Sequence, residues 1–343
     1  MTPDETFMIR AIALAQQGWP APNPRVGCVV VKDGAVVGEG FHDHAGGPHA
    51  EVVALRAAGE KARGGTAYVT LEPCAHHGRT PPCTEALIQA GVRRVVVAVN
   101  DPNPVAAGGC DALRQAGLDV QSGVLATEAE KGNEQFLTAM RRGRPFVIVK
   151  AAITLDGHTA WPDGRSKWIT SDAARLVGHR LRAECGAVLV GWRTVHTDNP
   201  SLTARIPGVV NQPLRVVVDP HSRLTGREHV FSQPGDSWWC VAETTQPGQT
   251  LLDPYGLDAL LELMVERGHS GLLVEGGGRT IRTFFEAGYV DRLELFVAPK
   301  VFGAGVPWLP PYGPMQGWTE RLVLESATVV GPDVHLSYRA LGN

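Results

Sequence analysis

Two short segments in the first quarter of the chain, Pro48-His49-Ala50-Glu51 and Pro73-Cys74, decide the fold of this half, together with Cys83 nine positions after Cys74. An imidazole and two thiolates are common zinc ligands, and three protein ligands are typical of catalytic zinc, which keeps a fourth position for water. A nearby carboxylate can take a proton from that water. The sequence therefore predicts a catalytic zinc site, with Glu51 as the base and three metal ligands: His49, Cys74 and Cys83.

The residues around these ligands place them at the starts of helices. Gly46-Gly47-Pro48 precedes an apolar-periodic run that predicts a helix over 50–58, and Cys83 opens a second predicted helix over 84–90. The positive end of a helix lowers the pKa of a thiol and favours the thiolate that binds metal. Zinc deaminases of nucleobases combine such ligands with a glutamate that does not touch the metal, but they usually space their cysteines C-x-x-C. Here eight residues separate the two cysteines, so we expect a larger loop beside the metal.

Alternation of short apolar runs with helical runs predicts an α/β fold for the first half. Residues 26–32 and 35–40 read as a hairpin joined by Asp33-Gly34. The strands that follow in the prediction span 66–71, 94–99 and 119–124, and the helices between and after them span 111–116 and 126–140. Such alternation predicts a parallel or mixed sheet with helices on both faces and ligands beyond the carboxyl ends of its strands.

Length and composition limit the possible functions. A chain of 343 residues fits two domains, and the basic segment 141–145 marks the predicted boundary, which gives domains 1–144 and 145–343. The net charge of −3 is spread along the chain, so we expect no nucleic-acid partner and no membrane partner. No apolar run reaches the roughly 18 residues that cross a bilayer. Six cysteines without framework spacing predict a reducing, cytoplasmic location.

The second half also alternates strands and helices. The predicted strands span 145–150, 187–190, 214–219, 238–242, 271–275 and 292–298, the predicted helices span 171–183, 257–267 and 280–287, and an antiparallel pair over 321–329 and 334–339 ends the chain. No Gly-x-Gly-x-x-Gly occurs, so a Rossmann domain is not predicted. The turn Glu275-Gly276-Gly277-Gly278 before a helix is either a phosphate cradle or only a tight turn. Lys150, Asp198 and Glu275 are strand-end or loop charges that either converge in a site or form surface ion pairs.

Two segments of the first half resemble a known family. The run 73–83 is similar to the zinc motif of the bifunctional riboflavin-biosynthesis deaminase-reductases, and Pro22-Asn23-Pro24-Arg25-Val26-Gly27 resembles their N-terminal substrate-binding segment. Segments 150–157, 166–171 and 190–205 resemble the reductase half, so the resemblance covers nearly the whole chain. It implies a cytidine-deaminase-like α/β/α sandwich, a dihydrofolate-reductase-like α/β domain that uses NADPH, and a homo-oligomer, either a dimer or a tetramer.

The resemblance also implies roles for individual residues. In the deaminase half, Asn23 and His42 would hold the pyrimidine, and His76 and Arg79 would contact its phosphate. In the reductase half the implied substrate contacts are Ser166, Arg182, Leu202, Arg205 and Glu275. The implied cofactor contacts are Ala152, Trp168, Thr194, Asp198, Gly277, Gly278 and Arg279. Lys150 and Asp198 match positions tied to the reduction, while Thr154 stands where serine is usual and Asn199 where a second acid is common.

The expected activity therefore has two steps and makes the protein both a hydrolase and an NADP-dependent oxidoreductase. The first step would be zinc-dependent deamination of 2,5-diamino-6-(5-phosphoribosylamino)pyrimidin-4(3H)-one, and the second NADPH-dependent reduction of its ribosyl group to ribityl. One alternative is a nucleoside or tRNA deaminase whose C-terminal half is a non-catalytic binding module. Another is a structural zinc site with His76 or His77 as fourth ligand.

Overall fold

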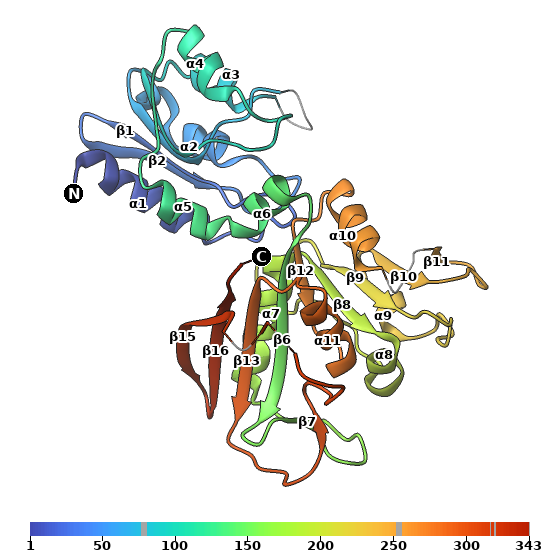
Figure 1. Cartoon of the computed structure of the whole chain (residues 1–343). Coiled ribbons are helices and arrows are strands. Elements are labelled where there is room, and N and C mark those ends of the chain that lie inside the picture. Colours follow the sequence, from blue (N-terminus) through green and yellow to red (C-terminus); the bar gives the residue numbers. More distant parts are fainter. Residues whose placement is uncertain (77–80, 252–255, 316, 319, 343) are drawn as a thin grey trace. The chain divides into compact units, whose positions relative to one another are not determined.

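The computed structural model describes residues 1–76, 81–251, 256–315, 317–318 and 320–342. It divides into two compact units, Met1–Arg142 and Gly143–Asn343, each built around a sheet of its own (Figure 1). Within the described part of the chain, none of the helices combines the length and the apolar character needed to cross a membrane.

The first unit contains a five-stranded mixed sheet in the order β2-β1-β3-β4-β5. The strands are β1 (Gly27–Lys32), β2 (Ala35–Phe41), β3 (Thr66–Leu71), β4 (Arg94–Val99) and β5 (Asp119–Ser122). β1 runs antiparallel to both β2 and β3, whereas β3, β4 and β5 are parallel. The predicted hairpin is confirmed, because Asp33 and Gly34 both adopt the positive φ that a tight two-residue turn requires.

Helices cover both faces of this sheet (Figure 1). One face packs against α2 (Ala50–Ala58), α3 (Cys83–Gln89) and α4 (Gly109–Gln115), and the other against α1 (Pro3–Ala15), α5 (Ala126–Gly132) and α6 (Glu134–Arg142). Alternate residues of β1 show the division, since Val30 packs toward α2 and Val29 toward α1. The α/β/α sandwich expected from the resemblance is therefore present.

The helix that carries the predicted zinc ligand lies unusually close to the sheet. β2 contains Gly38 and Gly40, and a side chain at either position would overlap the main chain of α2 near Ala54. Glycine is the residue that permits such a close approach of two backbones. This contact fixes the height of α2 over the sheet and hence the position of its first turn.

The prediction of one helix over 126–140 is wrong, because Asn133 separates α5 from α6. The buried Asn133 side chain accepts a hydrogen bond from the amide of Arg25 at 2.8 Å and donates one to the carbonyl of Arg25 at 2.8 Å. An asparagine side chain that bonds to main chain competes with helix continuation. The break is thus determined by a segment more than a hundred residues away in sequence.

Substitution of Asn133 by alanine is expected to destabilise the first unit by about 1–3 kcal/mol, because it leaves the Arg25 peptide without two partners. Urea denaturation followed by circular dichroism would measure the change, with the exposed Gln17→Ala as control. An unchanged denaturation curve would contradict the assigned role of these two hydrogen bonds.

The second unit is built on a nine-stranded sheet in the order β11-β10-β9-β8-β12-β6-β13-β16-β15, and a separate pair joins β7 and β14. The strands are β6 (Phe146–Thr154), β7 (His158–Ala160), β8 (Ala187–Gly191), β9 (Leu214–Val218), β10 (Ser237–Val241), β11 (Gln249–Leu251), β12 (Gly271–Val274), β13 (Arg292–Ala298), β14 (Val306–Pro307), β15 (Leu322–Val330) and β16 (Asp333–Ala340). From β11 to β13 neighbouring strands are parallel, and β16 and β15 complete the sheet antiparallel, as predicted for the chain end.

Helices also cover both faces of this larger sheet. They are α7 (Asp172–Cys185), α8 (Trp192–Asp198), α9 (His229–Ser232), α10 (Leu257–Glu266) and α11 (Gly278–Glu286). α7 packs on one face against Ile148 and Phe296, while α10 and α11 pack on the other against Val147 and Val149. The sequence patterns did not predict α8, α9, β7, β11 or β14, which are short.

The predicted end of β6 at Lys150 is wrong. The strand continues to Thr154, because its second half pairs with β13 from Ile148 to Thr154. Lys150 therefore lies in the middle of a central strand, where its side chain is only 19 % exposed. A cation in this position is held by a rigid sheet and not by a loop.

Candidate active sites

Three elements of the first unit bring the predicted zinc ligands together. His49 is the N-cap of α2, Cys74 follows β3, and Cys83 is the first residue of α3. Their ligand atoms all lie within 4.8 Å of one another. The Nδ1 atom of His49 is 3.2 Å from Cys83 Sγ and 3.6 Å from Cys74 Sγ. Tetrahedral zinc places such nitrogen and sulfur ligands about 3.5 Å apart, so the donor set fits this metal.

The surroundings of the Cys74 thiol favour a metal-binding thiolate. Hydrogen bonds from the Cys83 thiol and from His49 hold the pKa of the Cys74 thiol well below its usual range. The Cys83 amide also donates to Cys74 Sγ at 3.4 Å. An amide at the start of a helix carries partial positive charge that stabilises an anion. These contacts favour the thiolate form of Cys74, which is the form that binds metal.

Glu51 lies in the first turn of α2, on the side of the three ligands. Its side chain is 3 % exposed and contacts Cys83. Burial raises the pKa of the Glu51 carboxyl, against the opposing effects of its own amide and of His49. A raised pKa brings a carboxyl closer to the working pH, which is what a general acid–base group requires.

Asn23 and His42 form a second polar pair beside the metal ligands. The Nδ1 atom of His42 lies 3.1 Å from the Pro48 carbonyl, which can only accept, so Nδ1 carries the proton. The Nε2 atom then accepts from the Asn23 amide at 3.1 Å. The ring of His42 lies edge-on to that of His49, with the ring centres 5.3 Å apart. This pair therefore presents the oriented carboxamide of Asn23 near the site.

The loop between the two cysteines is described only in part. His76 Nδ1 is buried without a hydrogen-bond partner among the described residues, and His76 is not a member of the ligand cluster. The structural-zinc alternative thus finds no fourth ligand in His76. Its other candidate, His77, and the predicted phosphate contact Arg79 lie outside the described residues.

Sequence reasoning missed an acid at the base of this loop. The buried Glu72 accepts hydrogen bonds from the amides of Asp101 at 3.0 Å and Cys110 at 2.8 Å. It thereby ties the end of β3 to the segments that follow β4. The sequence contained a signal for this role. Glu72 is an acidic residue at the end of an apolar strand, two positions before the predicted metal ligand Cys74.

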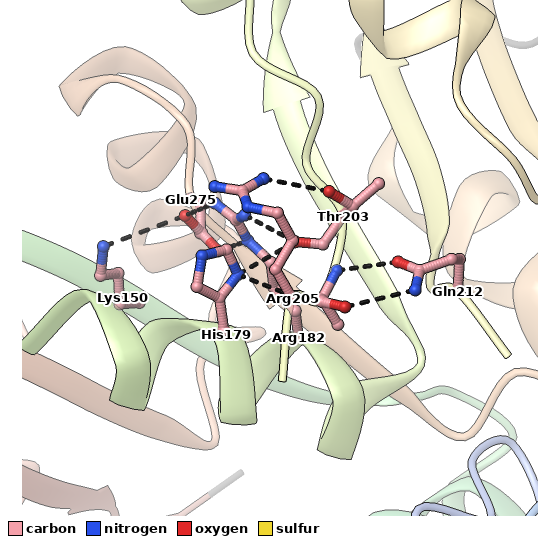
Figure 2. Close-up of polar contacts among 8 residues, drawn as sticks. Lys150, His179, Arg182, Thr203, Arg205, Gln212 and Glu275 are labelled. Carbon is pink, nitrogen blue, oxygen red and sulfur yellow. Dashed lines mark hydrogen bonds and ion pairs between the residues drawn. The ribbon is translucent and has the colours of Figure 1, made fainter. Parts of the chain in front are cut away.

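In the second unit, three of the predicted residues form a charged cluster (Figure 2). Arg182 on α7 donates to both carboxylate oxygens of Glu275, at 2.6 and 2.8 Å. The Nζ atom of Lys150 lies 3.9 Å from the same carboxylate. A paired arginine and a second cation around one acid leave a net positive charge in a mostly buried place.

The charges and the burial of this cluster shift the pKa values of Glu275 and Lys150. Burial alone would raise the pKa of Glu275, but the charges of Arg182 and Lys150 lower it to about 2. Burial lowers the pKa of Lys150 against the opposing charge of Glu275, and the guanidinium of Arg182 acts in the same direction as burial. Glu275 therefore stays ionised, and the Lys150 ammonium releases its proton more readily than an ordinary lysine does.

His179 joins this cluster although the sequence analysis did not select it. It lies one helical turn before Arg182 on α7, and its Nδ1 atom is 3.0 Å from the Thr203 carbonyl. Burial and the charges of Arg182 and Arg205 lower the pKa of His179 to about 4, so the ring is neutral. The spacing of three residues on a predicted helix was the signal that could have identified it.

Arg205 and Leu202 belong to the segment that passes beside His179. Arg205 donates to Thr203 Oγ1 at 3.0 Å, and its side chain is exposed. Leu202 is buried and has a positive φ, which turns the chain at this point. The structure thus brings four of the predicted residues to one place: Lys150, Arg182, Arg205 and Glu275.

Most of the predicted cofactor residues form a separate group. Asp198 ends α8 and interacts with Lys167 and Ser166, and burial raises the pKa of its carboxyl. The amide of Gly277 donates to Thr194 Oγ1 at 3.2 Å. Among the described residues, no hydrogen bond or ion pair joins Asp198 to Lys150.

The start of α11 is the predicted site for an anionic dinucleotide. Gly277 is exposed, and a Cβ there would meet only Thr194 at 3.7 Å, so packing does not demand glycine. Gly278 is different, because a Cβ would overlap the carbonyl of Trp308. Open main chain at a helix start, next to the exposed Arg279, fits a phosphate.

The last two predicted cofactor residues lie elsewhere in this unit. Trp168 is 62 % exposed, and the guanidinium of Arg175 lies 4.3 Å from the centre of its ring. Ala152 follows Lys150 by two residues on β6 and so lies on the same face of the sheet. Neither has a contact that defines a role by itself.

Comparison with known proteins identifies both halves of the chain. Residues 1–99 match the cytidine and deoxycytidylate deaminase zinc-binding region, and residues 145–336 match the RibD C-terminal domain. The riboflavin biosynthesis protein RibD of Escherichia coli is 44% identical, and the alignment covers 97% of this chain and 98% of that protein. A C-terminal half that is only a binding module is therefore not supported.

Solved structures give the same result. The RibD structure from Acinetobacter baumannii, form 1, has a TM-score of 0.92 and 40% identity over 99% of both chains. The diaminohydroxyphosphoribosylaminopyrimidine deaminase/5-amino-6-(5-phosphoribosylamino)uracil reductase from Thermotoga maritima has a TM-score of 0.89 and 38% identity, covering 98% of this chain and 99% of the other. The chain therefore belongs to the RibD family of riboflavin biosynthesis proteins, with a deaminase domain followed by a reductase domain.

Proposed function

We propose that this protein catalyses two consecutive reactions on one phosphoribosyl pyrimidine. Residues 1–144 would hydrolyse an amino group of 2,5-diamino-6-(5-phosphoribosylamino)pyrimidin-4(3H)-one, and residues 145–343 would reduce the ribosyl group of the product with NADPH. The name of the Thermotoga maritima relative states both activities for that protein. The observation that carries the proposal here is the cluster of three zinc-type ligands with a buried carboxyl beside it.

In the deaminase half, the proposed ligands of Zn²⁺ are His49, Cys74 and Cys83. Zinc, when bound there, would act as a Lewis acid that makes a water molecule more acidic. Glu51 takes a proton from the attacking water and delivers it to the departing amino group, so that water and the amine become a carbonyl and ammonia. Asn23 and His42 orient the pyrimidine, and His76 and Arg79 contact the phosphate.

In the reductase half, NADPH would supply a hydride to C1 of the ribosyl group, and the protein would supply position and a proton. We assign the phosphate to Arg182 and Arg205, since guanidinium groups match phosphate oxygens in pairs. Lys150 lies beside Glu275 with a lowered pKa and is the candidate proton donor. Further substrate contacts are assigned to Ser166, Leu202 and Glu275.

The cofactor is assigned to the other group of residues. The start of α11 would hold its phosphate groups through Gly277, Gly278 and Arg279. Thr194 supports this turn through the Gly277 amide, and Asp198, the last residue of α8, is assigned to the same site. Ala152 and Trp168 complete the proposed contacts of NADPH.

The remaining assignments concern partners and location. We propose a homo-oligomer, a dimer or tetramer, that binds neither nucleic acid nor membrane. A cytoplasmic location is supported by the state of the cysteines, because none of the six, all of them described, forms a disulfide. Such thiols persist in a reducing compartment.

Incubation of the zinc-loaded protein with the diaminopyrimidinone ribotide tests both steps together. Without NADPH, mass spectrometry should detect a product in which one amino group has become a carbonyl. With NADPH, that product should gain two hydrogen atoms, and absorbance at 340 nm should fall in step. A substrate that keeps its mass under both conditions would refute the proposal.

A further inference from the structure

The segment Thr203-Ala204-Arg205 is held by a side chain from outside the charged cluster (Figure 2). Gln212 accepts a hydrogen bond from the Ala204 amide at 2.9 Å and donates one to the Ala204 carbonyl at 3.2 Å. The carboxamide thus pairs with one residue's main chain in both directions, as a neighbouring strand would. Ala204 itself is buried, so water does not readily replace these two bonds.

The opposite side of the segment is fixed by α7. The carbonyl of Thr203 accepts from Arg182 Nη1 at 3.1 Å and lies 3.0 Å from His179 Nδ1. Because a carbonyl oxygen can only accept, Nδ1 carries the ring proton and donates it to Thr203. Side chains on both sides therefore hold the peptide groups that lead into Arg205.

This arrangement keeps two cations close together. Both guanidinium groups bind the same residue, Arg182 at the Thr203 carbonyl at 3.1 Å and Arg205 at the Thr203 hydroxyl at 3.0 Å. The charge of Arg182 accordingly adds to burial in lowering the pKa of Arg205. Glu275 compensates Arg182 through two hydrogen bonds, whereas the hydrogen bond of the Arg205 guanidinium goes to the neutral Thr203 hydroxyl. Repulsion between like charges would move an untethered Arg205 toward solvent.

Gln212 is well placed to resist that movement. Pro213 follows it, and a residue before proline is confined to an extended backbone. β9 begins at the next residue, Leu214, and lies between β8 and β10 inside the sheet. The Gln212 side chain therefore projects from a residue whose backbone is fixed by a central strand. Its two hydrogen bonds restrict the movement of the Ala204 backbone.

We propose that Gln212 is a positioning residue of the reductase half, which holds the Ala204 peptide so that Arg205 stays beside Arg182 as a ready-made receptor for the substrate phosphate. The inference rests on the proposed function of this half. Ordering a flexible segment when a ligand binds costs free energy and weakens binding. A receptor that is ordered beforehand avoids this cost. Gln212 acts through Arg205, so its loss weakens substrate binding and not the transfer step.

The test compares variants of the full-length protein in NADPH oxidation with the deaminated ribotide. Gln212→Ala removes both hydrogen bonds, and Gln212→Leu removes them while keeping a similar volume. We expect either variant to raise the KM for the ribotide about 5- to 30-fold, the effect of one or two lost hydrogen bonds. The kcat at saturation and the deamination rate should stay near wild type, whereas the melting temperature should fall by a few degrees because the buried Ala204 peptide groups lose their partners. Gln233→Ala is the matched control, since Gln233 contacts Arg215 through its main chain.

A double substitution separates positioning from general support. If Gln212 acts through Arg205, adding Gln212→Ala to Arg205→Ala should change KM no further. Additive losses, or a fall in kcat equal to the rise in KM, would overturn the inference. A wild-type protein that fails to oxidise NADPH with this ribotide would instead refute the proposed function, so the two failures are distinct.

Discussion

Substitution of Glu51 by glutamine is expected to lower kcat for deamination by about 10³-fold or more, the upper part of the range for a lost acid–base group. The carboxyl is buried next to Cys83, and burial raises its pKa above the usual value for a glutamate. Glutamine has nearly the same shape but cannot move a proton. We therefore expect the fold and the metal site to survive while the chemistry stops.

Three measurements on this variant distinguish chemistry from structure. Zinc content should remain at the wild-type level, because Glu51 is not among the three ligands. NADPH oxidation with the deaminated ribotide should be unchanged, since all residues of the charged cluster lie between positions 150 and 275, outside the first unit. Glu60→Gln, an exposed position after α2, is the matched control. Retained deamination in Glu51→Gln, or zinc lost together with activity, would contradict the assigned role.

The zinc site could be predicted from sequence because each ligand depends on a local signal. His49 and Cys83 both stand where a predicted helix begins, and Cys74 follows a predicted strand. Helix starts and the carboxyl ends of strands meet at one edge of such a sheet, so neighbouring elements deliver the three side chains without long-range information. The same reasoning correctly placed most strands of both sheets.

Features that depend on distant partners could not be predicted in this way. The helix break at Asn133 exists because of a peptide at Arg25, and Lys150 lies in mid-strand because β13 pairs with it. Gln212 looks like a loop residue in the sequence, and only the structure places it against Ala204. The periodicity of apolar residues indicates which face of a helix or strand is buried. It does not indicate which distant side chain forms the hydrogen bonds of a particular peptide group.

Substitution of Lys150 by methionine is expected to reduce kcat for NADPH oxidation by about 10²- to 10⁴-fold, as for loss of a positioned proton donor. Methionine keeps the apolar stem of the side chain, which lies between α7 and the sheet near Gly178. It removes the ammonium that lies 3.9 Å from Glu275. Deamination should be unaffected, and Arg267→Met, at an exposed position after α10, serves as the control.

Lys150→Arg decides what the lysine contributes. Arginine restores the positive charge beside Glu275, but its pKa is too high for it to donate a proton. If Lys150 is the donor, the arginine variant should recover the KM for the ribotide and leave kcat as low as in Lys150→Met. Full recovery of kcat would mean that charge alone is needed, and a fully active Lys150→Met would remove Lys150 from the reaction. The lowered pKa of this lysine favours the first outcome, because burial makes its proton easier to release than that of an ordinary lysine.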